Sequence, residues 1–428
     1  MLDPKLVREN PDVIRRDLEK RNDSAKLELL EQVVAQDAAW RRLTEEVNGL
    51  RHERNDIAKK IAETKKAKGD ASSLLARAAE IPKKIEEDGA RLEELRKSID
   101  AGLMRLPNIL HESVPVGKDD GDNLEVRRWG EPKVPPFELK PHGELAECLG
   151  GADFDRARKV AGAGFVYLLG DIALLDQAIL RYAIDSLVEK GYTLVEPPLM
   201  MHRAPYEGVV DLSDFESVMY KIEGEDLYLI ATSEHPMGAM FMDEIIDDAR
   251  LPIKLCGVSP CFRKEIGAHG LDTKGLFRVH QFNKIEQFVF CSPEDSWRMH
   301  EELLANAEAL FQGLKIPYHV VNVCTGDIGT IAAKKYDIEA WSPRQKKYIE
   351  VVSCSNCTDY QARRLRIRSG RVGSEGKRVP HTLNSTAVAT SRALVVILEN
   401  YQNADGSVTV PEVLRKYMGG KERILAGK

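Results

Sequence analysis

The chain has 428 residues, of which 43% are apolar and 30% charged, as is typical of a folded protein with two or three domains and not of a disordered chain. It contains no apolar run of about 18 residues or more, which argues against a transmembrane helix, and its first ten residues lack the apolar core of a secretory signal. With 62 Lys and Arg against 68 Asp and Glu, the net charge of −6 excludes a generally basic nucleic-acid coat, so an RNA partner would need a local basic surface.

Residues 27–104 are predicted to form two antiparallel helices of a coiled coil. The segment is nearly free of Pro and Gly, and its apolar residues recur at alternating steps of four and three, which keeps one stripe against a partner helix. A break at Gly69 separates two such stripes, and a short turn makes neighbouring helices pack antiparallel. Pro82 lies inside the second stripe, so this helix is expected to kink there or to begin there.

The turn end of this hairpin is basic. Residues 51–68 contain seven Lys or Arg against three acids. Such a charge run is most often a solvated helix face. On an acidic protein, however, a protruding arm with a basic end favours contact with a nucleic-acid backbone. The candidate contact residues are Arg51, Arg54, Lys59, Lys60, Lys65 and Lys66.

The composition changes after the hairpin. Residues 107–143 are rich in Pro, Gly and Asp and are predicted to link a domain 1–106 to a domain 144–428. In the second domain an amphipathic helix over 171–189 precedes a strand-like segment 192–195. Alternating runs predict further strands of a largely antiparallel sheet at 226–231, 253–262, 276–290, 317–323 and 348–353. A last helix, over 391–401, is apolar on most sides and should be buried.

Common nucleotide and metal motifs are missing from the sequence. There is no GxxxxGK[ST] phosphate loop and no HExxH, and the stretch from Gly162 does not complete GxGxxG. Cys354 and Cys357 form a lone CxxC, which indicates buried structural thiols more than a zinc site. The seven cysteines are scattered and odd in number, which favours reduced thiols and a cytoplasmic location.

Residues 261–290 carry the candidate chemistry. Two strand-like segments flank a loop that contains Gly267, Gly270 and Gly275. Side chains alternate on the second strand, so one face is expected to carry Arg278, His280, Phe282, Lys284 and Glu286. Burying such a face is costly without a ligand or tight pairing. It would suit a nucleotide, with Arg263 on a phosphate and Phe282 under a base; the alternative is an internal salt-bridge ladder on a solvated sheet face.

This stretch resembles motif 2 of the seryl-tRNA synthetases, a family of class II aminoacyl-tRNA synthetases, in Phe262-Arg263-x-Glu265 and in Arg278-Val-His-Gln-Phe282-x-Lys-x-Glu286. The likeness covers nearly the whole chain: the hairpin is similar to the family's tRNA-binding arm, 192–200 to motif 1, 353–364 to the ATP-site strand, and 383–392 to motif 3. Ser233 and Cys357 resemble the archaeal and eukaryotic branch. The resemblance implies an α+β fold: a class II antiparallel β-sheet catalytic domain flanked by helices, an N-terminal antiparallel α-helical coiled-coil arm, and a homodimer.

The resemblance also implies the site, position by position. The ATP-binding residues would be Arg263, Lys264, Glu265, Arg278, Val279, Phe282, Glu350, Val351, Val352, Ser353 and Arg392. The serine-binding residues would be Thr232, Ser233, Glu234, Arg263, Glu286, Asn384 and Thr386, with Ser385 as the alternative to Thr386 for the serine hydroxyl. Arg263 and Arg392 would be catalytic, on the α- and γ-phosphates. Glu350 and Ser353 would hold Mg²⁺ with ATP, and no zinc is expected.

The implied activity is that of a serine–tRNA ligase, which activates L-serine with ATP and transfers it to tRNA(Ser); tRNA(Sec) stays open as a second acceptor. Two alternatives are a catalytically silent tRNA-binding relative and an enzyme that activates serine for a carrier protein. A silent relative would be expected to lose charged site residues, yet Arg263, Glu286 and Arg392 are all present. The intact helical arm counts against the carrier protein. No membrane partner is expected.

Overall fold

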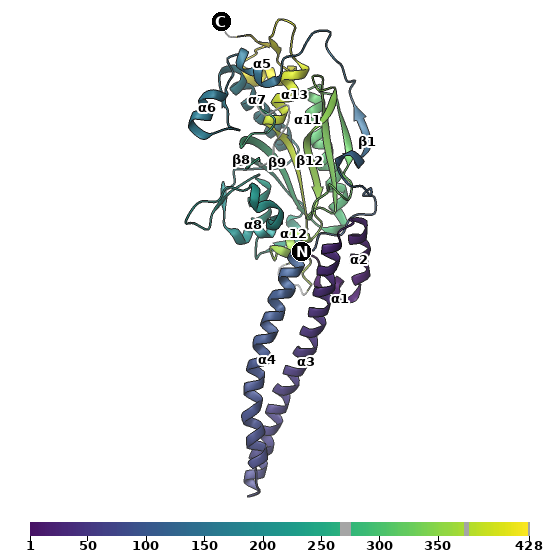
Figure 1. The fold of residues 1–428 in the computed structure, drawn as a ribbon, viewed down its shortest axis with the longest axis vertical. Coiled ribbons are helices and arrows are strands. Elements are labelled where there is room, and N and C mark those ends of the chain that lie inside the picture. Colours follow the sequence, from purple (N-terminus) through teal and green to yellow (C-terminus); the bar gives the residue numbers. More distant parts are fainter. Residues whose placement is uncertain (266–274, 372–375, 427–428) are drawn as a thin grey trace. The chain divides into compact units, whose positions relative to one another are not determined.

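The computed structural model describes residues 1–265, 275–371 and 376–426, except for the side chains of Ser213 and Asp214. The chain divides into two compact units, Met1–Ile109 and Leu110–Lys428 (Figure 1). Within the described residues the first unit is wholly helical and the second holds every strand. No helix in the described part of the chain is long and apolar enough to cross a membrane.

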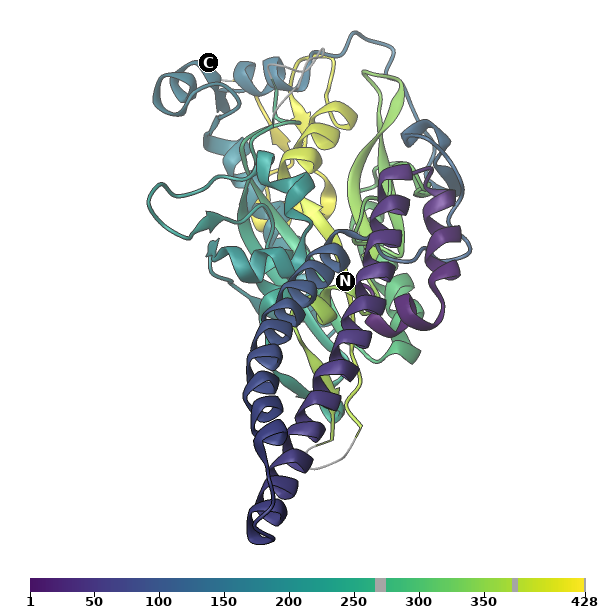
Figure 2. The ribbon, with the colours of Figure 1, turned by 60° about the horizontal axis from the view of Figure 1, so that its bottom comes forward.

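The first unit is built around a helical hairpin. Its helices are α1 (Pro4–Glu9), α2 (Pro11–Lys20), α3 (Ser24–Lys66) and α4 (Ser72–Arg105). Helices α3 and α4 lie side by side along their length (Figures 1 and 2), which confirms the predicted coiled-coil arm. Helix α3 begins earlier than the sequence pattern predicts, where Asp23 accepts a hydrogen bond from the Lys26 amide at 3.0 Å. Helix α4 runs through Pro82 and does not begin there.

Apolar side chains between α3 and α4 hold the hairpin together. Val33 and Val47 of α3 are 1% exposed, and Ile81 and Leu103 of α4 are equally buried. At Gly102 the two helices come so close that a Cβ atom would lie 2.4 Å from Cγ2 of Val33. A larger residue at position 102 would therefore push the arm's base apart.

The second unit contains one large mixed sheet. Its strands, in spatial order, are β1 (Leu124–Trp129), β10 (Tyr318–Asn322), β11 (Lys334–Ser342), β12 (Lys347–Asn356), β14 (His381–Ala389), β9 (Gln281–Cys291), β8 (Ile253–Phe262) and β4 (Thr193–Val195). All neighbours are antiparallel except β4 and β8, which are parallel. The predicted antiparallel sheet is thus confirmed. Strand β1 lies within 107–143, so part of the segment whose composition indicated a linker belongs to the sheet.

Helices and short strand pairs surround this sheet. The helices are α5 (His142–Cys148), α6 (Phe154–Ala161), α7 (Gly170–Glu189), α8 (Arg203–Val209), α9 (Leu212–Phe215), α10 (Glu234–Ala239), α11 (Ser296–Gly313), α12 (Tyr360–Arg364), α13 (Thr390–Asn400) and α14 (Glu412–Arg415). The short pairs are β2 (Ala152–Asp153) with β3 (Tyr167–Leu168), β5 (Met200–Met201) with β6 (Tyr228–Leu229), β7 (Ile245–Asp247) with β13 (Arg368–Gly370), and β15 (Val408–Thr409) with β16 (Arg423–Ile424).

Helix α11 covers one face of the large sheet. Gln287 of β9 is fully buried, and its Nε2 donates to the carbonyl of Leu303 in α11 at 3.0 Å. Because side chains alternate along a strand, Glu286 points to the opposite face. That opposite face carries the pocket described below.

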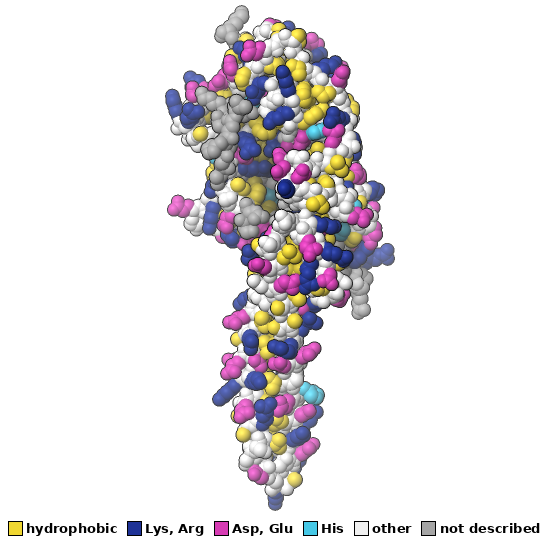
Figure 3. Space-filling view, turned by 45° about the vertical axis from the view of Figure 1, so that its right-hand side comes forward, with side chains coloured by type: hydrophobic (Ala, Val, Ile, Leu, Met, Phe, Trp, Pro, Cys, Tyr) yellow, Lys and Arg dark blue, Asp and Glu magenta, His cyan; other side chains and the backbone are white. Residues whose placement is uncertain are grey.

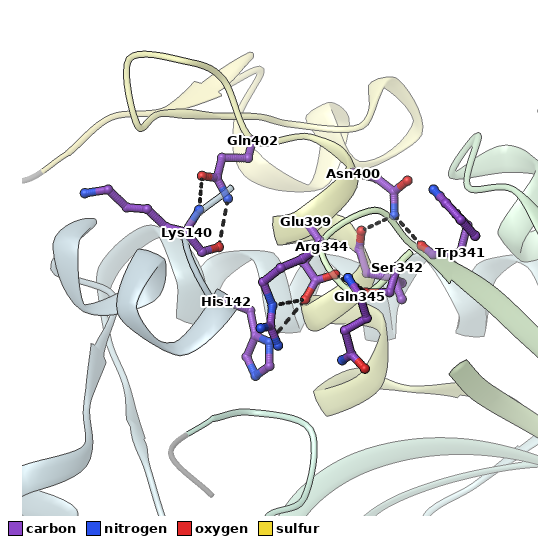
Figure 4. A network of polar contacts seen from close by, with 10 residues as sticks. Lys140, His142, Trp341, Ser342, Arg344, Gln345, Glu399, Asn400 and Gln402 are labelled. Carbon is purple, nitrogen blue, oxygen red and sulfur yellow. Dashed lines mark hydrogen bonds and ion pairs between the residues drawn. The ribbon is translucent and has the colours of Figure 1, made fainter. Parts of the chain in front are cut away.

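A buried polar network fixes helix α13 (Figure 4). The carboxylate of Glu399 accepts hydrogen bonds from Ser342 Oγ at 2.5 Å and Arg344 Nε at 3.2 Å, and lies 3.4 Å from Nδ1 of His142. Burial would raise the pKa of Glu399, but the hydrogen bonds from His142 and Ser342 keep it below its usual value. The network ties α13 to α5 and to the β11–β12 turn, and so holds Arg392, at the start of α13, against the sheet.

Candidate active site

An open pocket of about 360 Å³ lies on the face of the sheet opposite α11. Its floor is formed by β9, β12 and β14, and its walls by residues 328–332, the segment after β6 and the first turn of α13. Four acidic and four basic side chains are among its lining residues. The pocket therefore suits a ligand that carries both anionic and cationic groups.

Two β-bulges decide which side chains reach this pocket. On β12 the pairing passes from Ile338↔Val352 to Glu339↔Glu350, which leaves Val351 as the extra residue. Strict alternation would place Glu350 and Ser353 on opposite faces, but with the bulge both line the pocket. On β14 the pairing passes from Thr386 to Val388 in the same way, with Ala387 as the extra residue.

Two arginines line the pocket. Nη1 of Arg392 donates to Oε1 of Glu350 at 2.7 Å and to the Glu350 carbonyl at 3.0 Å. Burial opposes ionisation of Glu350, but the charges of Arg392 and Lys335 hold its pKa below the usual value. Nε of Arg263 donates to the Ala231 carbonyl at 3.2 Å. Both guanidinium groups are thus anchored while part of each lines the pocket, an arrangement suited to phosphate oxygens.

Each of the two arginines lies beside an aromatic ring. The guanidinium carbon of Arg263 is 5.4 Å from the ring centroid of Phe282, and that of Arg392 is 5.3 Å from the centroid of Phe277. Arg278 is exposed and lines the pocket, while Val279 is 4% exposed and contributes apolar lining. A flat aromatic base could stack on Phe282.

Two carboxylates and a lysine also line the pocket. Nζ of Lys284 is 2.5 Å from Oε2 of Glu286, to which Oγ1 of Thr386 also donates at 3.5 Å. Burial, reinforced by the charge of Glu286, raises the pKa of Glu234 to about 7. Burial likewise raises the pKa of Glu286, against the attraction of Lys284. Such a pair of acids is ready to receive an ammonium group.

Lys284 and His235 are among the pocket residues that received no role from the sequence. Lys284 is 5% exposed and neutralises Glu286; its alternation with Phe282 and Glu286 on β9 is the signal that points to it. His235 lies beside Glu234, and its Nδ1 is 2.9 Å from the Tyr206 hydroxyl. Burial and the charges of Lys284 and Arg263 hold the pKa of His235 well below the usual value, so it is neutral.

The structure brings most of the predicted site residues together. The pocket lining includes Thr232, Glu234, Arg263, Glu265, Arg278, Val279, Phe282, Glu286, Glu350, Val351, Ser353, Asn384, Thr386 and Arg392. Three predicted residues are outside this lining: Ser233 donates to the Gly257 carbonyl, Lys264 lies over the Tyr220 ring, and Val352 is 1% exposed in the core. Contacts of these three with a ligand would fall to main-chain atoms.

Two further predictions concern neighbouring residues. His280 does not join the ligand face: its Nδ1 bonds to the Tyr220 hydroxyl and its ring stacks on Phe165, because β9 begins only at Gln281. Ser385 is fully buried and donates to the Thr386 carbonyl, whereas Thr386 lines the pocket. Gly267 and Gly270 lie outside the described residues. Cys354 and Cys357 are buried free thiols, as the lone CxxC predicts.

The six basic candidates of the helical arm are all exposed. These residues are Arg51, Arg54, Lys59, Lys60, Lys65 and Lys66. Among the described residues none of them is held in an ion pair, whereas Arg77 of α4 pairs with Glu53 at 2.8 Å. Basic and acidic side chains are interspersed along the arm (Figure 3).

The chemistry of the pocket also bears on metal binding. In the described part of the chain no cluster of three or more His, Cys, Asp or Glu could hold an ion alone. Glu350 and Ser353 offer hard oxygen ligands side by side. Mg²⁺ is commonly bound by one or two carboxylates together with substrate phosphates, and this donor set fits that pattern.

Family models match both units of the chain. Residues 1–110 match the seryl-tRNA synthetase N-terminal domain, and residues 218–401 match the tRNA synthetase class II core domain (G, H, P, S and T). A serine–tRNA ligase of Methanocella arvoryzae is 62% identical over 99% of this chain and all of its own length. A serine–tRNA ligase of Pyrococcus horikoshii is 53% identical over 99% of this chain and 97% of its own length.

Solved structures give the same result. The seryl-tRNA synthetase of Pyrococcus horikoshii, complexed with ATP, superimposes with a TM-score of 0.97 at 52% identity over the whole of both chains. The cytoplasmic serine–tRNA ligase of Naegleria fowleri, in complex with AMP, has a TM-score of 0.92 at 38% identity, covering 100% of this chain and 99% of its own.

Proposed function

Because the chain belongs to the seryl-tRNA synthetase family and is an ATP-dependent serine–tRNA ligase, we propose that the pocket on its sheet performs serine activation with the side chains described above. The observation that carries this assignment is the set of groups that the pocket brings together: two arginines, an aromatic ring and a pair of buried carboxylates. This set matches the phosphates and the base of ATP and the ammonium group of serine.

In the first step, a carboxylate oxygen of serine attacks the α-phosphorus of ATP. The bond from this phosphorus to the β-phosphate oxygen breaks and pyrophosphate leaves, which gives seryl-adenylate. Arg263 stabilises the charge that develops on the α-phosphate, and Arg392 holds the departing γ-phosphate. The adenine ring stacks on Phe282, and Glu265 accepts a hydrogen bond from the adenine amino group. No enzyme nucleophile is needed, so the rate enhancement rests on positioning and charge stabilisation.

Serine is held beside the carboxylates of Glu234 and Glu286. Glu286 binds its ammonium group, with Thr232, Glu234 and Asn384 around it. Thr386 bonds the serine hydroxyl. Alanine leaves these buried polar partners without hydrogen bonds, which costs affinity. The larger side chain of threonine meets the Thr232 and Thr386 side chains.

In the second step, a terminal ribose hydroxyl of the tRNA attacks the carbonyl carbon of seryl-adenylate and AMP leaves. The helical arm, with Arg51, Arg54, Lys59, Lys60, Lys65 and Lys66, binds the backbone of tRNA(Ser). The support for this role is their exposure and the match of residues 1–110 to the family's N-terminal domain. Backbone contacts of this kind weaken as salt increases.

Glu350 and Ser353 would hold Mg²⁺ together with the phosphates of ATP. The ion would neutralise phosphate charge in the transition state. Arg392 keeps the Glu350 carboxylate ionised and oriented for this role.

The active form is a cytoplasmic homodimer. Apolar side chains exposed along β4 and the segment after it support this proposal: Leu194 is 42% exposed, Leu199 39% and Met200 43%. A second copy covering this edge would remove them from water. Analytical ultracentrifugation at micromolar concentration checks the dimer, and a monomer mass would reject it.

Serine-dependent exchange of pyrophosphate into ATP tests the activation step directly. With folded protein and Mg²⁺ present, exchange is expected with serine and not with alanine. Thermal stabilisation by tRNA without exchange would instead indicate a catalytically silent tRNA-binding relative.

A further inference from the structure

Asp337 lies beside the pocket without belonging to its lining. On β11 it pairs directly with Ser353 of β12, and directly paired residues project to the same face of a sheet. The side chain is 4% exposed. Its Oδ2 is 3.4 Å from Nζ of Lys335, while its buried Oδ1 has no hydrogen-bond partner. A buried carboxylate oxygen without a donor is costly, so it points to an interaction that forms in the loaded site.

The neighbouring hydroxyl has the complementary need. For Ser353 to bind Mg²⁺, a lone pair of its oxygen must face the ion, so its O–H bond must point elsewhere and find an acceptor. The carboxylate of Glu350 is already engaged by Arg392 at 2.7 Å. Burial raises the pKa of Asp337, and the charge of Lys335 opposes this rise.

We propose that Asp337 is a positioning residue whose carboxylate accepts a hydrogen bond from the Ser353 hydroxyl and thereby turns the lone pairs of this oxygen toward the Mg²⁺ bound with ATP. Lys335 holds the second carboxylate oxygen and fixes the orientation of Asp337. The inference rests on the proposed Mg²⁺ role of Ser353. Partners that orient a ligand in this way commonly change metal affinity by about 10- to 100-fold when removed.

The test is ATP binding to the full chain by isothermal titration calorimetry over a series of Mg²⁺ concentrations, which requires no turnover. Asp337→Leu removes the acceptor and is expected to raise the half-saturating Mg²⁺ concentration about tenfold. Asp337→Asn keeps a carbonyl oxygen and is expected to lie between this variant and the native protein. Ser353→Ala should act as strongly as Asp337→Leu, and the double variant should exceed it by no more than about twofold, because the two residues act as one unit.

Lys335→Met is the comparison variant: it removes the ion pair that orients Asp337 but leaves the acceptor, so it should raise the half-saturating concentration by less than Asp337→Leu does. If Asp337→Leu fails to unfold cooperatively, the same cycle is run with Asp337→Asn. The inference would be overturned if the increase in half-saturating Mg²⁺ concentration in the double variant equalled the product of the increases in Asp337→Leu and Ser353→Ala. An increase in Lys335→Met equal to that in Asp337→Leu would overturn it as well. A Ser353→Ala variant with native Mg²⁺ dependence would instead remove the Mg²⁺ role of Ser353 itself.

Discussion

Glu286 on β9 and Thr386 on β14 are direct cross-strand partners, and the Thr386 hydroxyl donates to the Glu286 carboxylate at 3.5 Å. Both side chains are at least nine-tenths buried and line the pocket. Thr386→Val keeps the volume and removes the hydroxyl, so a buried polar partner is lost. We expect KM for serine to rise about 10- to 100-fold with KM for ATP unchanged, and the preference for serine over alanine to shrink. Thr386→Ser is the control that retains the hydroxyl; steady-state pyrophosphate exchange measures all three.

Serine affinity should depend on pH near neutrality. The pKa of Glu234 is raised to about 7 and that of Glu286 is also raised, so below pH 7 the free enzyme carries a proton that must leave before the ammonium group binds. The apparent Kd for serine should therefore increase as pH falls below about 7, by up to about tenfold per unit. Calorimetry at pH 6.5 in two buffers of different ionisation enthalpy should detect proton release. A Glu234→Gln variant with the same release would assign the proton elsewhere.

Arg392 should be irreplaceable by another cation. Its Nη1 alone donates to both the side chain and the carbonyl of Glu350, which leaves the other guanidinium nitrogens for the pocket. The ammonium group of lysine has only one nitrogen and cannot serve both. We expect both Arg392→Lys and Arg392→Met to lower the exchange rate by about 100-fold or more. Serine binding, measured by thermal shift, should persist in both. Native exchange in Arg392→Lys would contradict the need for a second guanidinium nitrogen at this position.

The helical arm should affect tRNA charging and not activation. Changing Lys59, Lys60, Lys65 and Lys66 together to Glu is expected to raise KM for tRNA(Ser) at least tenfold, to flatten its salt dependence, and to leave pyrophosphate exchange native. Lys97→Glu, on the exposed side of α4, is the matched control. If Lys97→Glu loses as much tRNA charging as the fourfold variant, the tRNA contact does not lie at the turn end of the hairpin.

The network around Glu399 should make stability sensitive to acid. Because the folded-state pKa of Glu399 lies below its usual value, its contribution is present above pH 4.5 and is lost as pH falls through the folded-state pKa. Glu399→Gln at pH 7 removes the charge that faces Arg344 and is expected to cost about 2 kcal/mol. Urea unfolding at pH 7 and pH 4 measures both effects. If Glu399→Gln lowers the free energy of unfolding equally at both pH values, the charge of Glu399 does not contribute to stability.

The middle of β9 follows the alternation of the sequence closely: Phe282, Lys284 and Glu286 share the pocket face as predicted. The prediction fails at the end of this strand, where His280 lies before β9 begins and turns to Tyr220. Tertiary contacts decide where a strand starts, and alternation alone does not contain that information.

Where the resemblance to the family assigns several consecutive residues to the site, not all of their side chains reach the pocket. Ser233 and Val352 stand between residues that reach the pocket, but their own side chains point into the protein. Conversely, Glu350 and Ser353 appear on opposite faces by simple parity and meet only because of the bulge at Val351. The bulge depends on pairing with β11, a neighbour that local pattern does not specify.

That single additional residue also governs where the chain can change in length. Adding or deleting one amino acid between positions 350 and 353 would turn the Ser353 hydroxyl to the α11 side of the sheet. It would then no longer share the pocket with the Glu350 carboxylate, which Arg392 holds. The β11–β12 turn at 343–346, a few positions upstream, does not set which face of the sheet a side chain takes, although Arg344 and the Gln345 amide bond to Glu399 and Ser342. Across relatives, gaps in alignment should therefore fall in the turn and never inside the E-x-x-S spacing.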